Sequence, residues 1–200
     1  MAEAPEGREG AKRIEAFSDG VIAIIVTIMV LELHAPEQAG LEPLLRLWPV
    51  FLAYVLSFAY VCIYWVNHHR LFHFATRVSN SLVWSNNLLL FTLSLIPFAT
   101  AYLGEHAFSR DATILYMTVM LLPAMAWGWL QSVIRDTGRQ DDAALTYHRQ
   151  VIRKGWTASA IYALGIPLAF VTPVLSLACA ALVAILWFAP KSPFDRMFAR

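Results

Sequence analysis

The 200-residue sequence has little charge: only 14% of its residues are Asp, Glu, Lys or Arg, while 58% are hydrophobic. Soluble domains have about 25% charged residues, so this chain has too few to cover a water-facing surface. The shortage excludes a soluble enzyme, a secreted disulfide scaffold and a disordered chain, and indicates a membrane protein that crosses the bilayer several times. The net charge of +1 also argues against a nucleic-acid-binding protein.

Cysteine and histidine are scarce as well. Cys62 and Cys179 both lie in apolar runs, so the chain has no disulfide framework and no Cys-x-x-Cys metal motif. His68, His69 and His73 cluster near the end of one apolar run, but the other three histidines are scattered, and a membrane metalloenzyme needs several such clusters. We therefore expect no metal site and no enzymatic activity. A TVGYG loop is also absent from the sequence, which excludes an ion filter built from its carbonyl groups.

Long apolar runs dominate what is present. They do not alternate as membrane β-strands do, and a helix needs about 20 residues to cross a bilayer core. We predict an all-α, polytopic membrane protein with one domain over residues 1–200. Its six transmembrane helices are expected at approximately 17–33, 44–66, 82–103, 112–133, 156–171 and 174–189. Pro173 separates the last two, which could be two short spans or one re-entrant hairpin.

The distribution of Lys and Arg predicts how the chain crosses the membrane. All of them except Arg46 and Arg110 fall at the two ends of the chain, in the loop between segments two and three, or in the loop between segments four and five. Loops rich in Lys and Arg stay on the cytoplasmic side. Both termini are therefore expected to be cytoplasmic, in a multi-pass protein of the cell membrane.

The first apolar segment is unusually short. Its uninterrupted part runs from Gly20 to Leu31, between Asp19 and Glu32. A charged side chain at the bilayer centre costs about 2.5–3.5 kcal/mol on insertion scales, so such residues usually face protein or water. We therefore expect an inner helix with hydrated ends.

A helical projection divides this segment into two faces. At about 100° per residue, one face contains Ile24, Thr27, Ile28 and Leu31, with Gly20 beside them, while Asp19 points roughly 140° away from Ile24. An apolar stripe of this kind fits either ordinary helix packing or the lining of a pore. The opposite face would present the Asp19 carboxylate to neighbouring helices.

The pattern Arg13-x-x-x-Phe17-Ser18-Asp19-Gly20 followed by an apolar helix resembles the signature of the transmembrane protein 175 family. Two further stretches resemble the family, SFAYVCIYWVNHHRLFHF from Ser57 and LVWSNNLLLFTLSLIPFATAYLG from Leu82. The family consists of potassium-permeable channels. The resemblance implies a homotetramer whose pore is lined by helix one of each subunit, with K⁺ and other monovalent cations as the permeating ions and no cofactor.

The resemblance also implies roles for particular residues. The apolar constriction of the family lies five residues after the motif aspartate, which is Ile24 here, and the hydroxyl position eight residues after it is Thr27. The constriction and selectivity residues are thus predicted to be Ile24, Thr27, Ile28 and Leu31. A structural role is predicted for the motif residues Arg13, Phe17, Ser18, Asp19 and Gly20. A straight helix would place Arg13 near the Ile24 stripe. Other side chains could hold the motif. Its possible partners are Trp65, His68, His69 and Asn87, of which the histidines and Asn87 could hydrogen-bond to Ser18 or Asp19.

Two functions of different kinds remain open from the residues. One is a potassium-permeable cation channel, and the alternative is a secondary or proton-coupled ion transporter. Transporters usually show an internal repeat and a charged or broken-helix site at mid-membrane, and the sequence shows neither. A packing-only membrane scaffold would leave the Arg13–Gly20 motif unexplained.

Overall fold

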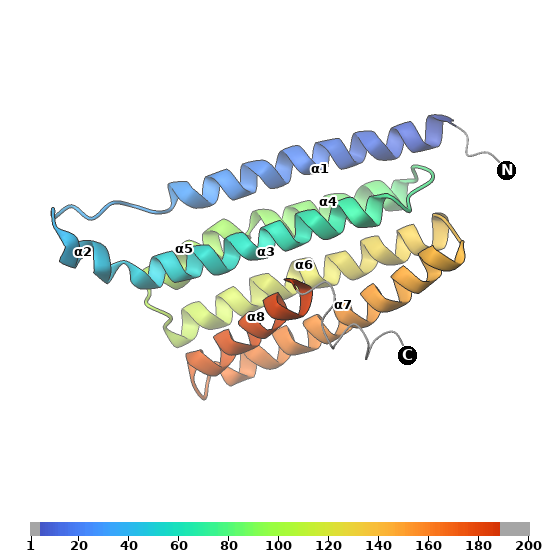
Figure 1. Cartoon of the computed structure of the whole chain (residues 1–200). Helices are drawn as coiled ribbons and strands as arrows, with labels where there is room; N and C mark the ends of the chain where they lie inside the picture. Colours follow the sequence, from blue (N-terminus) through green and yellow to red (C-terminus); the bar gives the residue numbers. More distant parts are fainter. Residues whose placement is uncertain (1–4, 189–200) are drawn as a thin grey trace.

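The computed structural model describes residues 5–188, and these form helices and connecting loops without strands (Figure 1). The helices are α1 (Pro5–Leu31), α2 (Leu41–Arg46), α3 (Trp48–Phe72), α4 (Asn80–Ser94), α5 (Ile96–Glu105), α6 (Arg110–Thr137), α7 (Asp142–Leu168) and α8 (Pro173–Phe188). The all-α prediction is confirmed. The last residue of the sixth predicted helix, at position 189, and the basic residues Lys191, Arg196 and Arg200 lie outside the described residues.

Four stretches within residues 5–188 are long and apolar enough to cross a membrane: Gly7–Leu31, Trp48–Phe72, Asn80–Glu105 and Arg110–Thr137. The apolar helix α8 has only 16 residues. The predicted count of six transmembrane helices and the cytoplasmic position of both termini therefore stay predictions.

Several helix ends differ from those predicted. Helix α1 starts at Pro5 instead of residue 17, because Glu, Ala, Lys and Arg before the apolar run are strong helix formers. The third segment is divided into α4 and α5 near Leu95, where Pro97 stands in the first turn of α5 and has no backbone N–H to donate. Hydropathy marks the part of a helix that fits the hydrocarbon, and it does not mark where the helix ends.

The fifth helix shows the largest difference. The sequence predicts a short span from residue 156, and before it a polar and helical cytosolic connector over residues 135–155. Instead, α7 is one continuous helix of 27 residues that includes most of the connector. Its N-terminus is capped by Asp141, whose carboxylate accepts a hydrogen bond of 2.8 Å from the backbone N–H of Ala144. This bond and the nearby Arg139 guanidinium hold the pKa of Asp141 below its usual value.

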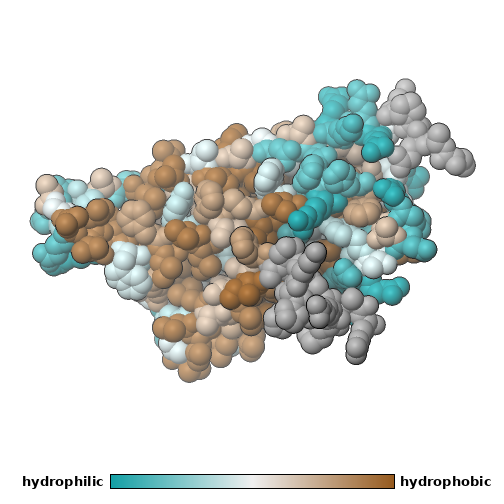
Figure 2. Space-filling view, in the orientation of Figure 1, coloured by the Kyte–Doolittle hydropathy of each residue, from teal (hydrophilic) through white to brown (hydrophobic). Residues whose placement is uncertain are grey.

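The polar ends of the helices gather at one end of the bundle. The start of α1, the α3–α4 connection and the α6–α7 connection lie together there, while α2 and the α7–α8 turn lie at the other end (Figure 1). The space-filling view shows hydrophilic residues concentrated at the first end and a broad hydrophobic band beside it (Figure 2). The loops that the charge pattern groups together are thus close in space.

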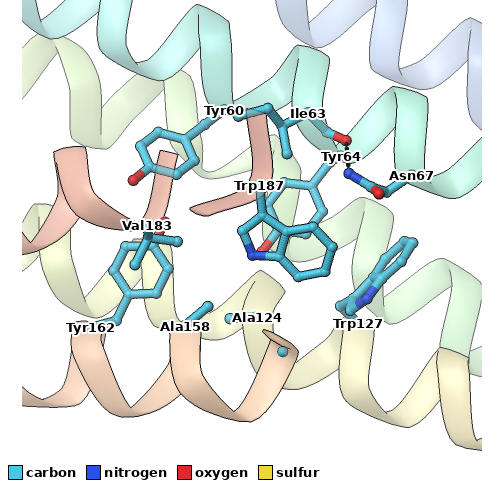
Figure 3. A pocket seen from close by; sticks show the side chains of 11 residues that line it. Tyr60, Ile63, Tyr64, Asn67, Ala124, Trp127, Ala158, Tyr162, Val183 and Trp187 are labelled. Atoms are coloured by element: carbon cyan, nitrogen blue, oxygen red, sulfur yellow. Dashed lines mark hydrogen bonds between the residues drawn. The ribbon is translucent and has the colours of Figure 1, made fainter. Parts of the chain in front are cut away.

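Aromatic side chains join α8 to the rest of the bundle. The rings of Tyr60 and Tyr162 lie 6.1 Å apart, and Trp187 of α8 meets Trp127 edge-on at 6.5 Å (Figure 3). The Tyr60 hydroxyl donates a hydrogen bond to the backbone carbonyl of Ala180 in α8. Large aromatic rings bury much apolar surface, so this cluster fixes the short last helix against α3 and α7.

Helices α3 and α5 approach closely at Gly104, and we expect Gly104→Ala to destabilise the protein. A Cβ atom at this position would lie 2.7 Å from the Cα of Val50, which is backbone and cannot rotate away. Overpacking of this kind costs about 1–3 kcal/mol. Thermal unfolding in detergent, followed by circular dichroism, measures the effect.

Gly128→Ala is the matched control, because a Cβ atom there has no heavy atom within 4 Å. It removes the low helix propensity of glycine, which is worth about 1 kcal/mol, and should raise the melting temperature slightly. Equal shifts in the two variants would contradict the close approach at Gly104.

Candidate pore helix and its anchor

Helix α1 has one face packed against its own chain and one face left open. The packed face contains Ile22, Ile25 and Met29, which are 2–4% exposed. The open face contains the four residues predicted for the constriction: Ile24 (57% exposed), Thr27, Ile28 (41%) and Leu31 (71%). The division agrees with the helical projection. Within one subunit the stripe stays exposed, and Ile24 and Ile28 border a groove beside Pro97 and Phe98.

Thr27 is also exposed, and the direction of its hydroxyl proton is fixed by a hydrogen bond. Its Oγ1 donates a hydrogen bond of 2.9 Å to the backbone carbonyl of Ile24, one turn earlier. Since the proton is used inside the helix, the oxygen lone pairs are the part of the hydroxyl left for an outside group. Thr27 is therefore the one hydroxyl acceptor on an otherwise apolar stripe.

The motif residues divide between the two faces of α1. Arg13, Phe17 and Gly20 lie on the exposed side, in line with Ile24, and a Cβ atom at Gly20 would meet nothing within 4 Å. Because α1 is continuous from Pro5, the helix places Arg13 away from Asp19. Among residues 5–188, no contact explains why Arg13, Phe17 and Gly20 occupy these positions. Their predicted structural role would have to involve another subunit.

Ser18 faces inward and joins a buried polar triad that links three helices. The Asn86 side-chain amide in α4 donates to the Ser18 hydroxyl at 2.9 Å, and Ser18 donates to the backbone carbonyl of Ile14 at 2.8 Å. The Asn86 carbonyl oxygen lies 2.8 Å from Nε2 of His68 in α3. A carbonyl only accepts, so the His68 proton is on Nε2. All three side chains of the triad are fully buried.

Asn87, the predicted amide partner, does not take part in this triad. It is exposed, and Asn86 occupies the inward position. Two consecutive residues on a helix point about 100° apart, so only one of them can face α1. The sequence contains both amides, but which of them points inward depends on how α4 is rotated against its neighbours.

A second set of polar contacts lies beside the triad, between α1 and α3. Trp65 donates its indole N–H to the Asp19 carboxylate at 2.9 Å, and Nδ1 of His69 lies 2.7 Å from the Glu15 carboxylate. The structure thus brings Trp65, His68 and His69 to the inward side of α1. Glu15 was missed by the sequence analysis, although it lies four residues before Asp19 and therefore on the same helix face.

These contacts hold α1 by one face and leave the opposite face available. The family model for the endosomal/lysosomal potassium channel TMEM175 matches residues 13–97, which include this whole arrangement. A potassium channel from Chryseobacterium sp. strain P1-3 is 40% identical over 185 residues, which are 92% of this chain and 95% of that protein. This chain belongs to the TMEM175 family.

Other relatives of this TMEM175 family member extend the comparison. A potassium channel from Chamaesiphon minutus is 34% identical over 203 residues, covering 96% of this chain and 99% of that protein. The crystal structure of a lysosomal potassium-selective channel TMEM175 homolog from Chamaesiphon minutus superimposes with a TM-score of 0.80, at 30% identity, over 90% of this chain. The human endosomal/lysosomal proton channel TMEM175 is 33% identical over 112 residues, which are half of this chain and 22% of that protein.

Membership of the TMEM175 family confirms the resemblance given by the Arg13–Gly20 motif. The family and its relatives are ion channels and not enzymes, so the chain is a membrane protein of the channel class. The roles assigned to individual residues stay predictions.

Proposed function

We propose that this protein is a potassium-permeable cation channel of the cell membrane, assembled as a homotetramer with α1 of each subunit around the pore. The observation that carries the proposal is the exposed stripe on α1, opposite a face anchored by Ser18 and Asp19. One apolar stripe cannot enclose a pore, but several stripes around a common axis can. The relatives named as potassium channels support the choice of ion.

The stripe suggests how ions are held back. A ring of Ile24 side chains offers no oxygen ligands, so an ion there keeps most of its water and the narrow neck can close by dewetting. Potassium sheds water more readily than sodium, so a modest preference for potassium follows. The Thr27 oxygen lies one turn along the same face and can accept a hydrogen bond from the partly stripped hydration shell. No cofactor takes part in this mechanism.

Recording from purified full-length protein in a planar bilayer tests the proposal. We expect discrete unitary currents whose reversal potential follows the potassium gradient. Saturating flux without unitary events would instead indicate the alternative, a secondary or proton-coupled ion transporter.

The assembly is tested by cross-linking α1 helices through Ile24→Cys, in a background where Cys62 and Cys179 are replaced by Ala. We expect disulfide-linked dimers under mild oxidation, because a ring at the axis brings equivalent Cα atoms within the roughly 7 Å that a disulfide needs. The matched control is Ile22→Cys, whose side chain is buried against its own subunit. Exclusive monomers of Ile24→Cys, or equal cross-linking of the control, would contradict the axial position of α1.

Thr27→Ala is expected to lower the preference for K⁺ over Na⁺ while conduction persists. A hydrogen bond is worth about 1 kcal/mol, so losing the discrimination of even one of the four hydroxyls lowers the ratio about fivefold. Reversal potentials under bi-ionic conditions measure the ratio. Thr118→Ala is the control, since its hydroxyl makes the same kind of bond to its own helix, to Ile114, at 2.8 Å in α6. An unchanged ratio in Thr27→Ala would place selectivity at Ile28 or Leu31.

A further inference from the structure

A groove of about 400 Å³ lies between α6 and α7. Figure 1 shows that these two helices pack on the opposite side of the bundle from α1. Its volume falls within the range of about 300–1,000 Å³ that small-molecule sites usually have. The residues that form it include Met125, Gly128, Trp129, Ser132 and Arg135 on α6 and Ile152, Gly155, Trp156 and Ser159 on α7. None of them belongs to the pore stripe or to its anchor.

Two glycines hollow out the groove. A Cβ atom at Gly128 or at Gly155 would have no heavy atom within 4 Å, so both positions border open space. Residues 125, 128, 132 and 135 follow one another at spacings of three and four, and so lie along one face of α6. At 1.5 Å per residue, the groove extends about 10 Å from Gly128 to Arg135. It therefore runs along the helices and not across them.

The end of the groove near the α6–α7 connection is cationic. Nε of Arg135 donates to the Asp136 carboxylate at 2.8 Å, which leaves the two terminal nitrogens of the guanidinium for another anion. The Arg135 side chain is 42% exposed, so these nitrogens are accessible. Trp129 and Trp156 also border the groove and are themselves exposed, and Trp156 follows Gly155 in its apolar part.

The groove thus joins the two environments that a phospholipid occupies. Its cationic end belongs to the hydrophilic end of the molecule, and from there α6 runs back into the hydrophobic band (Figure 2). Arginine pairs with phosphate through two parallel hydrogen bonds. A free phosphate would use Arg135 but would leave the apolar part of the groove, from Met125 to Gly155, unfilled.

We propose that this groove binds one anionic phospholipid, with its phosphate on the terminal nitrogens of Arg135 and one acyl chain along Gly128 and Gly155. A phosphate whose headgroup carries no cation of its own pairs more strongly with a guanidinium, so an anionic lipid is favoured over phosphatidylcholine. The site is separate from the pore and does not depend on which ion the channel conducts.

Native mass spectrometry of the purified full-length protein tests the site. The protein is exchanged into detergent with equal amounts of dioleoyl phosphatidylglycerol and dioleoyl phosphatidylcholine. We expect the wild type to retain phosphatidylglycerol, and Arg135→Gln to lower its apparent affinity about fivefold, since one basic residue contributes about 1 kcal/mol. Gly128→Leu should lower the retention of both lipids by filling the groove. Arg149→Gln removes the same charge from an exposed position outside the groove and should retain lipid like the wild type.

Two outcomes would overturn the proposal. Equal retention of phosphatidylglycerol by the wild type, Arg135→Gln and Gly128→Leu would show that the groove holds no lipid. Displacement of the lipid by millimolar glycerophosphate would show that the phosphate alone is recognised. If Gly128→Leu fails to fold, the acyl-chain position is tested instead by measuring the binding of the short-chain lipid dihexanoyl phosphatidylglycerol to the wild type. Binding as tight as that of the dioleoyl lipid would then contradict the position assigned to the acyl chain.

Discussion

Ile24→Asn is expected to raise the resting current about tenfold or more. Ile24 is the exposed residue on α1 that is predicted to form the constriction, and in the proposed tetramer the substitution changes four side chains at once. Amide groups hydrogen-bond water, so the neck would stay wet where isoleucine lets it dewet. Lowering the barrier by only about 1.4 kcal/mol already gives a tenfold rise in rate. Single-channel recording in symmetric potassium solution measures both the open probability and the conductance.

Val30→Asn is the matched control for Ile24→Asn. Val30 is exposed on the same helix but points roughly 120° away from Ile24, so its replacement introduces the same amide away from the expected constriction. Its currents should equal those of the wild type. If Ile24→Asn also left the currents unchanged, the closing ring would have to be Ile28 or Leu31.

Asn86→Leu is expected to prevent stable folding or assembly. The substitution leaves the Ser18 hydroxyl and the His68 imidazole without their shared partner, inside a fully buried environment. The buried His68 imidazole loses a bond worth about 1–3 kcal/mol, and Ser18, which keeps its bond to Ile14, loses a second one worth about 1 kcal/mol, so we expect about 2–4 kcal/mol in all. That is a large fraction of the stability of an ordinary domain. The yield of folded protein by size-exclusion chromatography and its melting temperature measure the loss.

The neighbouring Asn87→Leu provides the control, since Asn87 is exposed and makes no contact with the triad. Replacing the whole triad, with Ser18→Ala, His68→Phe and Asn86→Leu together, should recover part of the stability, because no buried polar group is then left unpaired. Normal assembly of Asn86→Leu would mean that α1 is held by its other contacts, such as that between Asp19 and Trp65.

Much of this protein follows from local features of the sequence. The shortage of charge and the long apolar runs identify a helical membrane protein, since only hydrogen-bonded helices or closed barrels can span hydrocarbon. The stripe containing Ile24 and the opposite direction of Asp19 also follow, because both depend only on the 100° step of a helix. The motif from Arg13 to Gly20 indicates the family, which the relatives then confirm.

Other features depended on how the helices pack. The choice of Asn86 over Asn87, the contact of Glu15 with His69 and the outward position of Phe17 depend on the rotation of each helix about its own axis. Neighbouring helices set that rotation, and a single segment does not encode it. The length of α7 likewise exceeded its apolar part because helix formation does not require hydrophobicity.

The groove between α6 and α7 is the clearest case of what the sequence alone could not supply. No sequence pattern distinguishes Gly128 and Gly155, which lie in two different segments, and Arg135 is one of many basic residues near a helix end. The sequence determined that each lies on a helix. Only the antiparallel packing of α6 on α7 brought the two glycines and the guanidinium to one hollow, because a cavity is a property of the space between elements and belongs to neither of them.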